Sequence, residues 1–316
     1  MDFPTAQDEF KDLLSRTDPL VLPKFIEWVA NVYCQTQVES MDRLSEADVF
    51  LNSICDDLRE EVPLMGLAPK ENIVFPTDNK RTECNPETTV SVDAFLYTDD
   101  IIDQLCEEGS MSRNYCKKCL SHDTAPLTFV SHSMSKTQVK FVFQYALPDL
   151  AEKMVLDVGS RLGAVLYGAY YFSSAKVIKG VEINDYFCEL SGKILSKYSL
   201  TDRVKIECSD ILQQSHLLQQ ADVVVLNNVF EFFTSPDVET KFWLLLRENV
   251  RKQGVILVTV PSLEESFESL KVNIELSSWL RPLPLENIVR RANLQLFGAK
   301  DSEESDLEGI YLYTVL

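Results

Sequence analysis

The segment Met154–Gly163, with the sequence MVLDVGSRLG, constrains the fold of this chain more than any other stretch. An apolar run ends in the acidic residue Asp157, and Gly159 and Gly163 follow two and six positions later. In open α/β sheets, such a strand and a glycine turn that opens a helix hold a nucleotide-like ligand. Glycine is needed because the turn must bring bare backbone close to that ligand. The segment therefore predicts a ligand site where a buried strand ends.

A second strand-like run, Val177–Ile183 (VIKGVEI), carries Glu182 near its end. An acidic side chain at this distance from the glycine turn can accept hydrogen bonds from both hydroxyls of a ribose. Together with the glycine turn, Glu182 predicts an adenosine-bearing cofactor.

Strand and helix patterns alternate from Met154 onward, which builds right-handed βαβ units and a parallel sheet. The sequence predicts strands at 154–158, 177–182, 203–208, 222–227 and 254–260, and helices at 163–172, 184–198 and 237–251. The two last strand-like runs, Asn293–Ala299 and Gly309–Leu316, are joined by a charged loop with no room for a helix. We expect these two runs to pair as a hairpin, so that the sheet ends in an antiparallel strand.

The N-terminal region has a different pattern. Residues 1–65 show helical spacing of apolar residues, and Ser45 with Glu46 is a candidate start of a further helix. The sequence next predicts a long loop over 66–89, a strand over 90–97 and helices over 98–108 and 137–150. We therefore divide the chain into residues 1–136, a mainly helical region with a long loop and a Cys/His cluster, and residues 137–316, the α/β domain.

The composition limits the partners. The 316 residues carry a net charge of −19, and such a surface repels phosphate backbones, so we expect no direct nucleic-acid contact. The charge suits a basic protein partner or a small cationic substrate, or it serves only solubility. No apolar run approaches the roughly 20 residues of a membrane span, and no signal peptide is evident. Eight scattered cysteines indicate reduced thiols, and hence a cytoplasmic or nuclear protein.

The second half of the chain, from Met154 to Leu316, resembles the class I S-adenosylmethionine-dependent methyltransferases. The resemblance implies a Rossmann-like, seven-stranded, mostly parallel sheet with an antiparallel C-terminal strand, and S-adenosyl-L-methionine as the cofactor. It assigns cofactor contacts to Asp157, Gly159 and Gly163 in the glycine turn, to Glu182 at the ribose, and to Asp210 at the adenine amino group. Arg161 replaces the central glycine of the family's first motif. For an enzyme, we expect its side chain to lie outside the cofactor pocket.

The segment VVVLNNVFEFF, which begins at Val223, resembles the corresponding stretch of the non-SET histone lysine methyltransferases. The resemblance implies that Asn227 lies nearest the methyl donor and that Phe230 or Phe232 lines a channel for the substrate. It implies a methyltransferase that acts on a protein lysine or another amine. Such an enzyme mainly supplies proximity and alignment, and aromatic walls lower the pKa of an amine by desolvation.

Cys116, Cys119 and His122, with His132 farther along, form the only cluster with metal-ligand spacing. Two thiolates this close can bind one zinc ion, and a histidine could complete the set. A single CxxC pair is more often a turn with two buried thiols, so we predict no metal site.

Two other classes of function stay open. The chain could be a non-catalytic interaction protein on a degenerate methyltransferase fold, which Arg161 would favour. It could also be a nicotinamide-dependent oxidoreductase, but that class needs a third glycine with different spacing, and the C-terminal hairpin argues against it.

Overall fold

The computed structural model describes residues 3–18, 21–69, 71, 85, 87–117, 124–228, 233–270, 272, 274–297, 307 and 309–316. The chain divides into two compact units, Met1–Phe50 and Leu51–Leu316. The division of the sequence between residues 136 and 137 rests on pattern alone and stays a prediction.

The chain begins with two helices, α1 (Phe3–Arg16) and α2 (Leu22–Glu61). The prediction that a new helix starts at Ser45 is wrong, because α2 continues through this residue. No glycine or proline interrupts the sequence between Lys24 and Val62, so nothing in this stretch breaks the helix. Within the second unit, the end of α2 buries residues at helical spacing, namely Leu51, Ile54, Cys55 and Leu58.

A seven-stranded sheet forms the centre of the second unit, in the order β10-β11-β9-β8-β5-β6-β7. Its strands are β5 (Met154–Val158), β6 (Val177–Glu182), β7 (Val204–Cys208), β8 (Val223–Asn227), β9 (Ile256–Val260), β10 (Leu280–Leu283) and β11 (Tyr311–Val315). Strand β11 runs antiparallel to both of its neighbours, and the other paired strands are parallel. The predicted mostly parallel sheet with an antiparallel C-terminal strand is therefore confirmed.

The predicted C-terminal hairpin is wrong. The run that starts at Asn293 belongs to helix α10 (Glu286–Phe297), and β11 pairs with β9 and β10 instead. Ile288, Val289, Ala292 and Leu296 recur at helical spacing, and Ala292 is fully buried. The sequence pattern missed β10 because this short edge strand contains Pro282, a residue tolerated at sheet edges.

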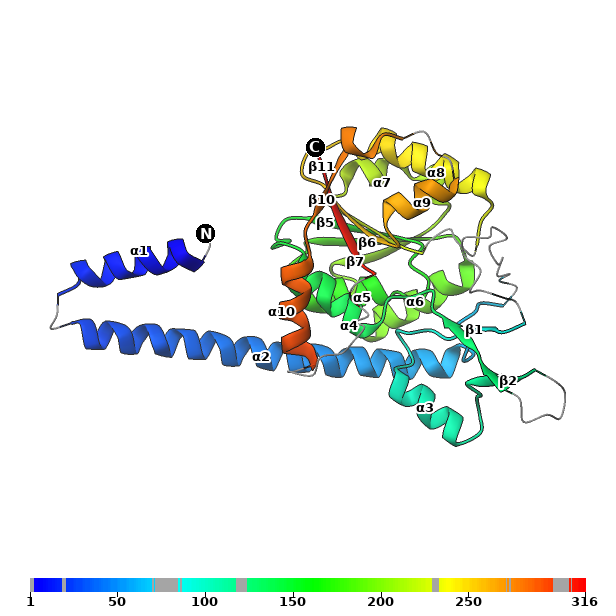
Figure 1. Ribbon diagram of the computed structural model, residues 1–316, viewed down its shortest axis with the longest axis horizontal. Helices are drawn as coiled ribbons and strands as arrows, with labels where there is room; N and C mark the ends of the chain where they lie inside the picture. Colours follow the sequence, from blue (N-terminus) through cyan, green and yellow to red (C-terminus); the bar gives the residue numbers. More distant parts are fainter. Residues whose placement is uncertain are drawn as a thin grey trace. The chain divides into compact units, whose positions relative to one another are not determined.

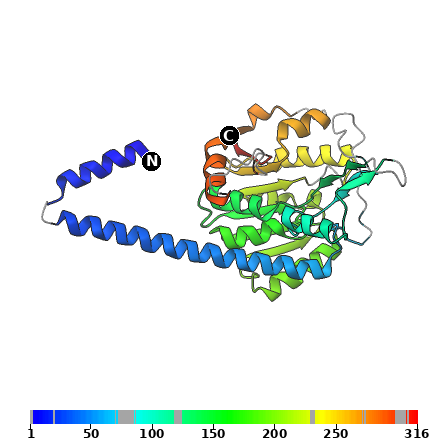
Figure 2. The same ribbon diagram turned by 60° about the horizontal axis from the view of Figure 1, so that its bottom comes forward.

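Helices cover both faces of the sheet (Figure 1). On one face lie α7 (Ser215–Gln220), α8 (Pro236–Asn249) and α9 (Leu263–Leu270). On the other lie α4 (Lys136–Lys140), the π-helix η1 (Phe141–Ala146), α5 (Ala164–Phe172) and α6 (Asp185–Lys197). The same layers can be followed in Figure 2. Since both faces are covered, the apolar strand residues are buried, and the strand ends are left to position polar groups.

Short elements precede the sheet. Strand β1 (Thr89–Ser91) pairs with β4 (Thr128–Val130), β2 (Asn114–Cys116) pairs with β3 (Thr124–Pro126), and α3 spans Asp99–Glu107. The predicted strand over 90–97 ends early because Asp93 starts a turn. Its Oδ1 accepts hydrogen bonds from the backbone N–H groups of Phe95 and Leu96.

Candidate functional site

The glycine turn after β5 is bonded directly to the neighbouring strand. The N–H of Gly159 donates to the carbonyl of Val181 at 2.8 Å. Gly159 and Gly163 have φ values of 73° and 83°, a region that side chains other than glycine rarely adopt. A Cβ atom on Gly163 would also lie 2.7 Å from Cζ of Tyr167. Both glycines are therefore required by the shape of the turn.

Two buried acids lie at the ends of the adjacent strands β5 and β6: Asp157 is the residue before the last of β5, and Glu182 is the last of β6. Burial raises the pKa of Asp157 well above its ordinary value, and the charge of Glu182 raises it further. Among the described residues, none donates a hydrogen bond to the carboxyl group of Asp157. Burial also raises the pKa of Glu182. A cationic ligand would stabilise the ionised form of such a buried carboxyl group, because it would compensate the negative charge.

Glu182 also holds the local backbone. Its Oε2 accepts from the N–H of Arg161 and its Oε1 from the N–H of Asn184, each at 2.8 Å. The next residue, Ile183, is apolar and 69% exposed. No motif in the sequence singles out Ile183. An exposed apolar side chain beside Glu182 offers a surface on which a base can stack.

Asp210 lies at the end of β7, close to the backbone of Glu182. The preceding residue, Ser209, donates its N–H to the carbonyl of Glu182 at 2.9 Å. Oδ1 of Asp210 accepts from the N–H of Leu212 and caps the short helix η2 (Ile211–Gln213). The fold thus brings Asp157, Glu182 and Asp210 to one edge of the sheet, while their contacts with a cofactor stay predictions.

Arg161 adopts a φ of 42°, which costs a residue with a side chain about 1–2 kcal/mol. Its side chain is buried, and its guanidinium pairs with the carboxylate of Glu71. The Nη2 atom donates to the carbonyl of Gly66 at 2.9 Å. The guanidinium carbon lies 4.8 Å from the ring centre of Phe187 and 4.9 Å from that of Phe233. The side chain of Arg161 is thus fixed by an ion pair, a hydrogen bond and contacts with two aromatic rings.

Asn227 ends β8 and has an oriented amide. Its Nδ2 donates to the carbonyl oxygen of His132 at 3.3 Å, which leaves Oδ1 as an acceptor. The neighbouring Asn228 has a φ of 47° and donates its N–H to Val260. Asparagine tolerates this left-handed conformation better than most residues.

His132 lies against Asn227 in this part of the site. Its ring meets Phe233 edge-on at 5.0 Å, and its Nε2 lies 3.3 Å from Oγ of Ser91. Burial, and then the charge of Arg161, lower the pKa of His132 to about 4. The imidazole is therefore neutral at physiological pH. The sequence pattern indicated His132 only as a candidate metal ligand and gave no sign of its place beside Asn227.

Other predicted residues lie outside the described part of the chain. Phe230 and Phe232, the candidate channel aromatics, are among them, and so are Cys119 and His122 of the Cys/His cluster. Within the described ranges, no three side chains of histidine, cysteine, aspartate or glutamate are grouped to hold a metal ion.

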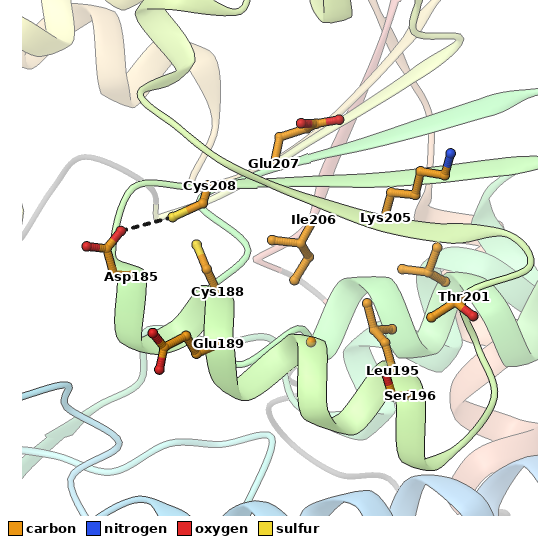
Figure 3. A pocket seen from close by; sticks show the side chains of 12 residues that line it. Asp185, Cys188, Glu189, Leu195, Ser196, Thr201, Lys205, Ile206, Glu207 and Cys208 are labelled. Atoms are coloured by element: carbon orange, nitrogen blue, oxygen red, sulfur yellow. Dashed lines mark hydrogen bonds between the residues drawn. The ribbon is translucent and has the colours of Figure 1, made fainter.

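A pocket of about 710 Å³ lies between α6 and β7, away from Asn227 (Figure 3). Cys188 and Cys208 face it, and Cys208 donates to Oδ1 of Asp185 at 3.1 Å. Burial raises the pKa of Cys188, so this thiol is protonated and a weak nucleophile at neutral pH. Cys188 is therefore not an activated nucleophile in this pocket.

No family model matches the chain, and no curated protein matches it. Solved structures resemble it at low identity. An RNA methyltransferase from Salinibacter ruber in complex with S-adenosyl-L-homocysteine is 19% identical, with a TM-score of 0.33 over 52% of this chain and 83% of that one. A precorrin-6y C5,15-methyltransferase from Geobacter metallireducens is 14% identical, with a TM-score of 0.36 over 57% and 85%. An rRNA methylase from Streptococcus thermophilus is 9% identical, with a TM-score of 0.35 over 57% and 92%.

One expectation is corrected here. The negative charge led us to expect a protein partner, such as a basic protein, and no direct nucleic-acid contact. The solved structures that resemble the chain include an RNA methyltransferase and an rRNA methylase, so the expectation of no nucleic-acid contact is withdrawn. Within the described residues, no helix is both long and apolar enough to cross a membrane.

The mostly parallel sheet and its antiparallel last strand, β11, agree with the arrangement expected from the sequence. Asp157 lies next to the end of β5, Glu182 ends β6 and Asp210 follows β7, and these three strands are neighbours in the sheet. This chain therefore has a Rossmann-like fold, with a seven-stranded, mostly parallel sheet and an antiparallel C-terminal strand.

Proposed function

We propose that this protein is an S-adenosylmethionine-dependent methyltransferase whose methyl acceptor is a nitrogen atom. The observation that carries the proposal is the orientation of Asn227. Its Nδ2 is engaged by the carbonyl of His132, so its Oδ1 is left to accept an N–H from the acceptor. An acceptor held this way directs its nitrogen lone pair toward the methyl donor.

The residues around the glycine turn fit the cofactor. The buried carboxyl groups of Asp157 and Glu182 suit a ligand with positive charge, and exposed Ile183 suits the face of an adenine. The bound cofactor supplies a methyl group on a sulfonium, which leaves by in-line displacement. The chain contributes position and exclusion of water, and these effects are worth up to about 7–11 kcal/mol in ideal cases.

The surroundings of Asn227 suit a neutral nitrogen. Phe233 and the uncharged ring of His132 lie in the part of the site around Asn227, so the acceptor nitrogen would contact apolar surface and not water. Desolvation lowers the pKa of an amine and so favours its reactive, neutral form. Phe230, outside the described residues, is proposed as a further aromatic wall.

A labelled-methyl assay tests the proposal. The purified protein is incubated with methyl-tritiated S-adenosylmethionine and with cell lysate separated into protein, RNA and small-molecule fractions. We expect one fraction to gain label with the wild type and much less with Asn227→Ala. No label in any fraction, from a protein that binds the cofactor, would contradict methyl transfer.

One observation favours a second candidate, a non-catalytic binding protein on the same fold. Arg161 stands at a position where the family has glycine, and its guanidinium is buried among Glu71, Phe187 and Phe233. Under this candidate, the side chain obstructs the cofactor. Arg161→Gly would then tighten cofactor binding tenfold or more.

A further inference from the structure

The guanidinium of Arg161 lies at the sheet edge where the candidate cofactor residues meet. Phe187 belongs to α6, which follows β6, and Phe233 follows β8. The guanidinium contacts both rings at nearly equal distances, 4.8 and 4.9 Å. Because parallel strands β5, β6 and β8 end at the same edge, the charged group lies over that edge. In open α/β sheets, this is the edge at which ligands bind.

The partner of this guanidinium, Glu71, is itself fixed in place. Its Oε2 accepts from the N–H of Ala68 at 2.9 Å, and its Oε1 pairs with Nη1 of Arg161. Gly66, which accepts from Nη2, packs against Asp93, because a Cβ on Gly66 would lie 2.9 Å from Cβ of Asp93. Asp93 is in turn held by Oγ of Ser133 at 2.6 Å. The two opposite charges are therefore presented in a fixed arrangement.

Arg161 and Glu71 can each form further hydrogen bonds. Nη1 and Nη2 of Arg161 each have a partner, but Nε is buried and has no acceptor in the described part of the chain. Arg161 as a whole is only 8% exposed. A buried donor without an acceptor is uncommon in a native protein and calls for a ligand or a water. Each carboxylate oxygen of Glu71 also has a further lone pair.

An adjacent positive and negative charge form a dipole, and a ligand with its own ammonium and carboxylate can align against it. The ligand carboxylate would face Arg161, and its ammonium would face Glu71. Each ligand charge then lies beside an opposite charge, in a site that excludes water and strengthens the attraction. In S-adenosylmethionine, the methionine end carries both of these groups.

We propose that Arg161 and Glu71 together recognise the α-amino-acid end of the cofactor, and that Arg161 takes over a part of the site that glycine forms in the related motif. This inference rests on the proposed function, because it assigns further residues to the same cofactor site, and it replaces the expectation that the side chain of Arg161 lies outside that site. Glu71 lies in a region where the sequence predicted only a loop.

Calorimetric titration with two ligands tests the inference. S-adenosyl-L-homocysteine carries the amino-acid end, and 5′-deoxy-5′-methylthioadenosine lacks it. We expect Arg161→Gly and Glu71→Gln each to weaken binding of S-adenosyl-L-homocysteine tenfold or more. Both should leave binding of 5′-deoxy-5′-methylthioadenosine within twofold, which also shows that each variant is folded. Glu61→Gln removes an exposed acid that faces Lys193 at 3.9 Å, and serves as the control with unchanged affinities.

The outcomes separate this inference from the proposed function. Unchanged or tighter binding of S-adenosyl-L-homocysteine by Arg161→Gly would overturn the recognition role and favour obstruction. Wild-type protein that binds only 5′-deoxy-5′-methylthioadenosine would overturn it as well, while leaving an adenosine site. Wild-type protein that binds neither ligand would overturn the proposed function itself. Arg161→Lys, which keeps the charge but loses the planar fork, should give an intermediate affinity for S-adenosyl-L-homocysteine.

Discussion

The backbone N–H of Arg161 donates a hydrogen bond of 2.8 Å to Oε2 of Glu182. This bond fastens the glycine turn after β5 to the acid at the end of β6. Because the other oxygen of Glu182 accepts from the N–H of Asn184, one carboxylate orders two backbone segments of the site. Glu182 is thus a structural residue of the turn as well as a candidate ribose ligand.

Glu182→Ala should lower the free energy of unfolding by about 2 kcal/mol, because two backbone N–H groups lose a charged acceptor. Urea denaturation of the ligand-free protein measures this change. Glu207→Ala, in the neighbouring strand β7, is the control and should stay within about 0.5 kcal/mol of wild type. Equal effects of the two substitutions would show that the contacts of Glu182 do not stabilise the turn.

Asp157→Asn should stabilise the ligand-free protein increasingly as the pH rises from 5 to 8. Burial and the charge of Glu182 raise the folded-state pKa of Asp157 above its unfolded value of about 3.9. Such a group contributes stability that is fully present below the unfolded pKa and is lost as the pH rises through the folded pKa. Asparagine cannot ionise, so the variant keeps this stability. Melting temperatures across the pH range test the effect, and a shift independent of pH would contradict it.

Asn227→Ala should lower methyl transfer by roughly 100-fold while cofactor affinity stays within about twofold. The reason is that a positioned polar group acts mainly in the transition state. Asn228→Ala should leave turnover closer to wild type but cost about 1 kcal/mol of stability, because Asn228 has a left-handed φ of 47°. Asn228→Gly is the matched control, since glycine adopts this conformation freely. Full activity of Asn227→Ala with loss in Asn228→Ala would move the assignment to Asn228.

Gly180→Ala should destabilise the protein by about 1–3 kcal/mol. A Cβ at this position would lie 2.8 Å from Oγ of Ser160 and 2.9 Å from Cδ1 of Leu166, so the turn after β5 would have to shift. Gly192→Ala meets nothing within 4 Å and lies inside helix α6, so it should be neutral or stabilising by up to about 1 kcal/mol. Thermal unfolding of the two variants tests the packing, and an equal loss of stability in both would contradict it.

Local patterns were sufficient to predict the centre of the fold. The buried strands read as short apolar runs, and the polar residues Asp157, Glu182 and Asn227 stand at or next to their ends. Strand direction then brings these residues to one edge, as expected for a parallel sheet. The α10 segment was misread because its last residues also alternate as a strand would, and only the preceding Ile288 and Val289 reveal the helical period.

Contacts between distant segments could not be predicted. Arg161 and Glu71 are 90 residues apart, and neither the glycine motif nor the sequence around Glu71 carries a signal that pairs them. The same holds for His132 and Asn227, which are 95 residues apart. A local pattern specifies helices, strands and turns, whereas such pairs depend on how the finished elements pack.

Calorimetric titration of the wild-type protein with S-adenosyl-L-methionine and S-adenosyl-L-homocysteine tests the central claim most directly, because every proposed step requires this cofactor site. The glycine turn, the buried acids and exposed Ile183 predict one site per chain with a dissociation constant in the micromolar range, about −8 kcal/mol. No detectable binding of either ligand at millimolar concentration would contradict the proposed methyltransferase function.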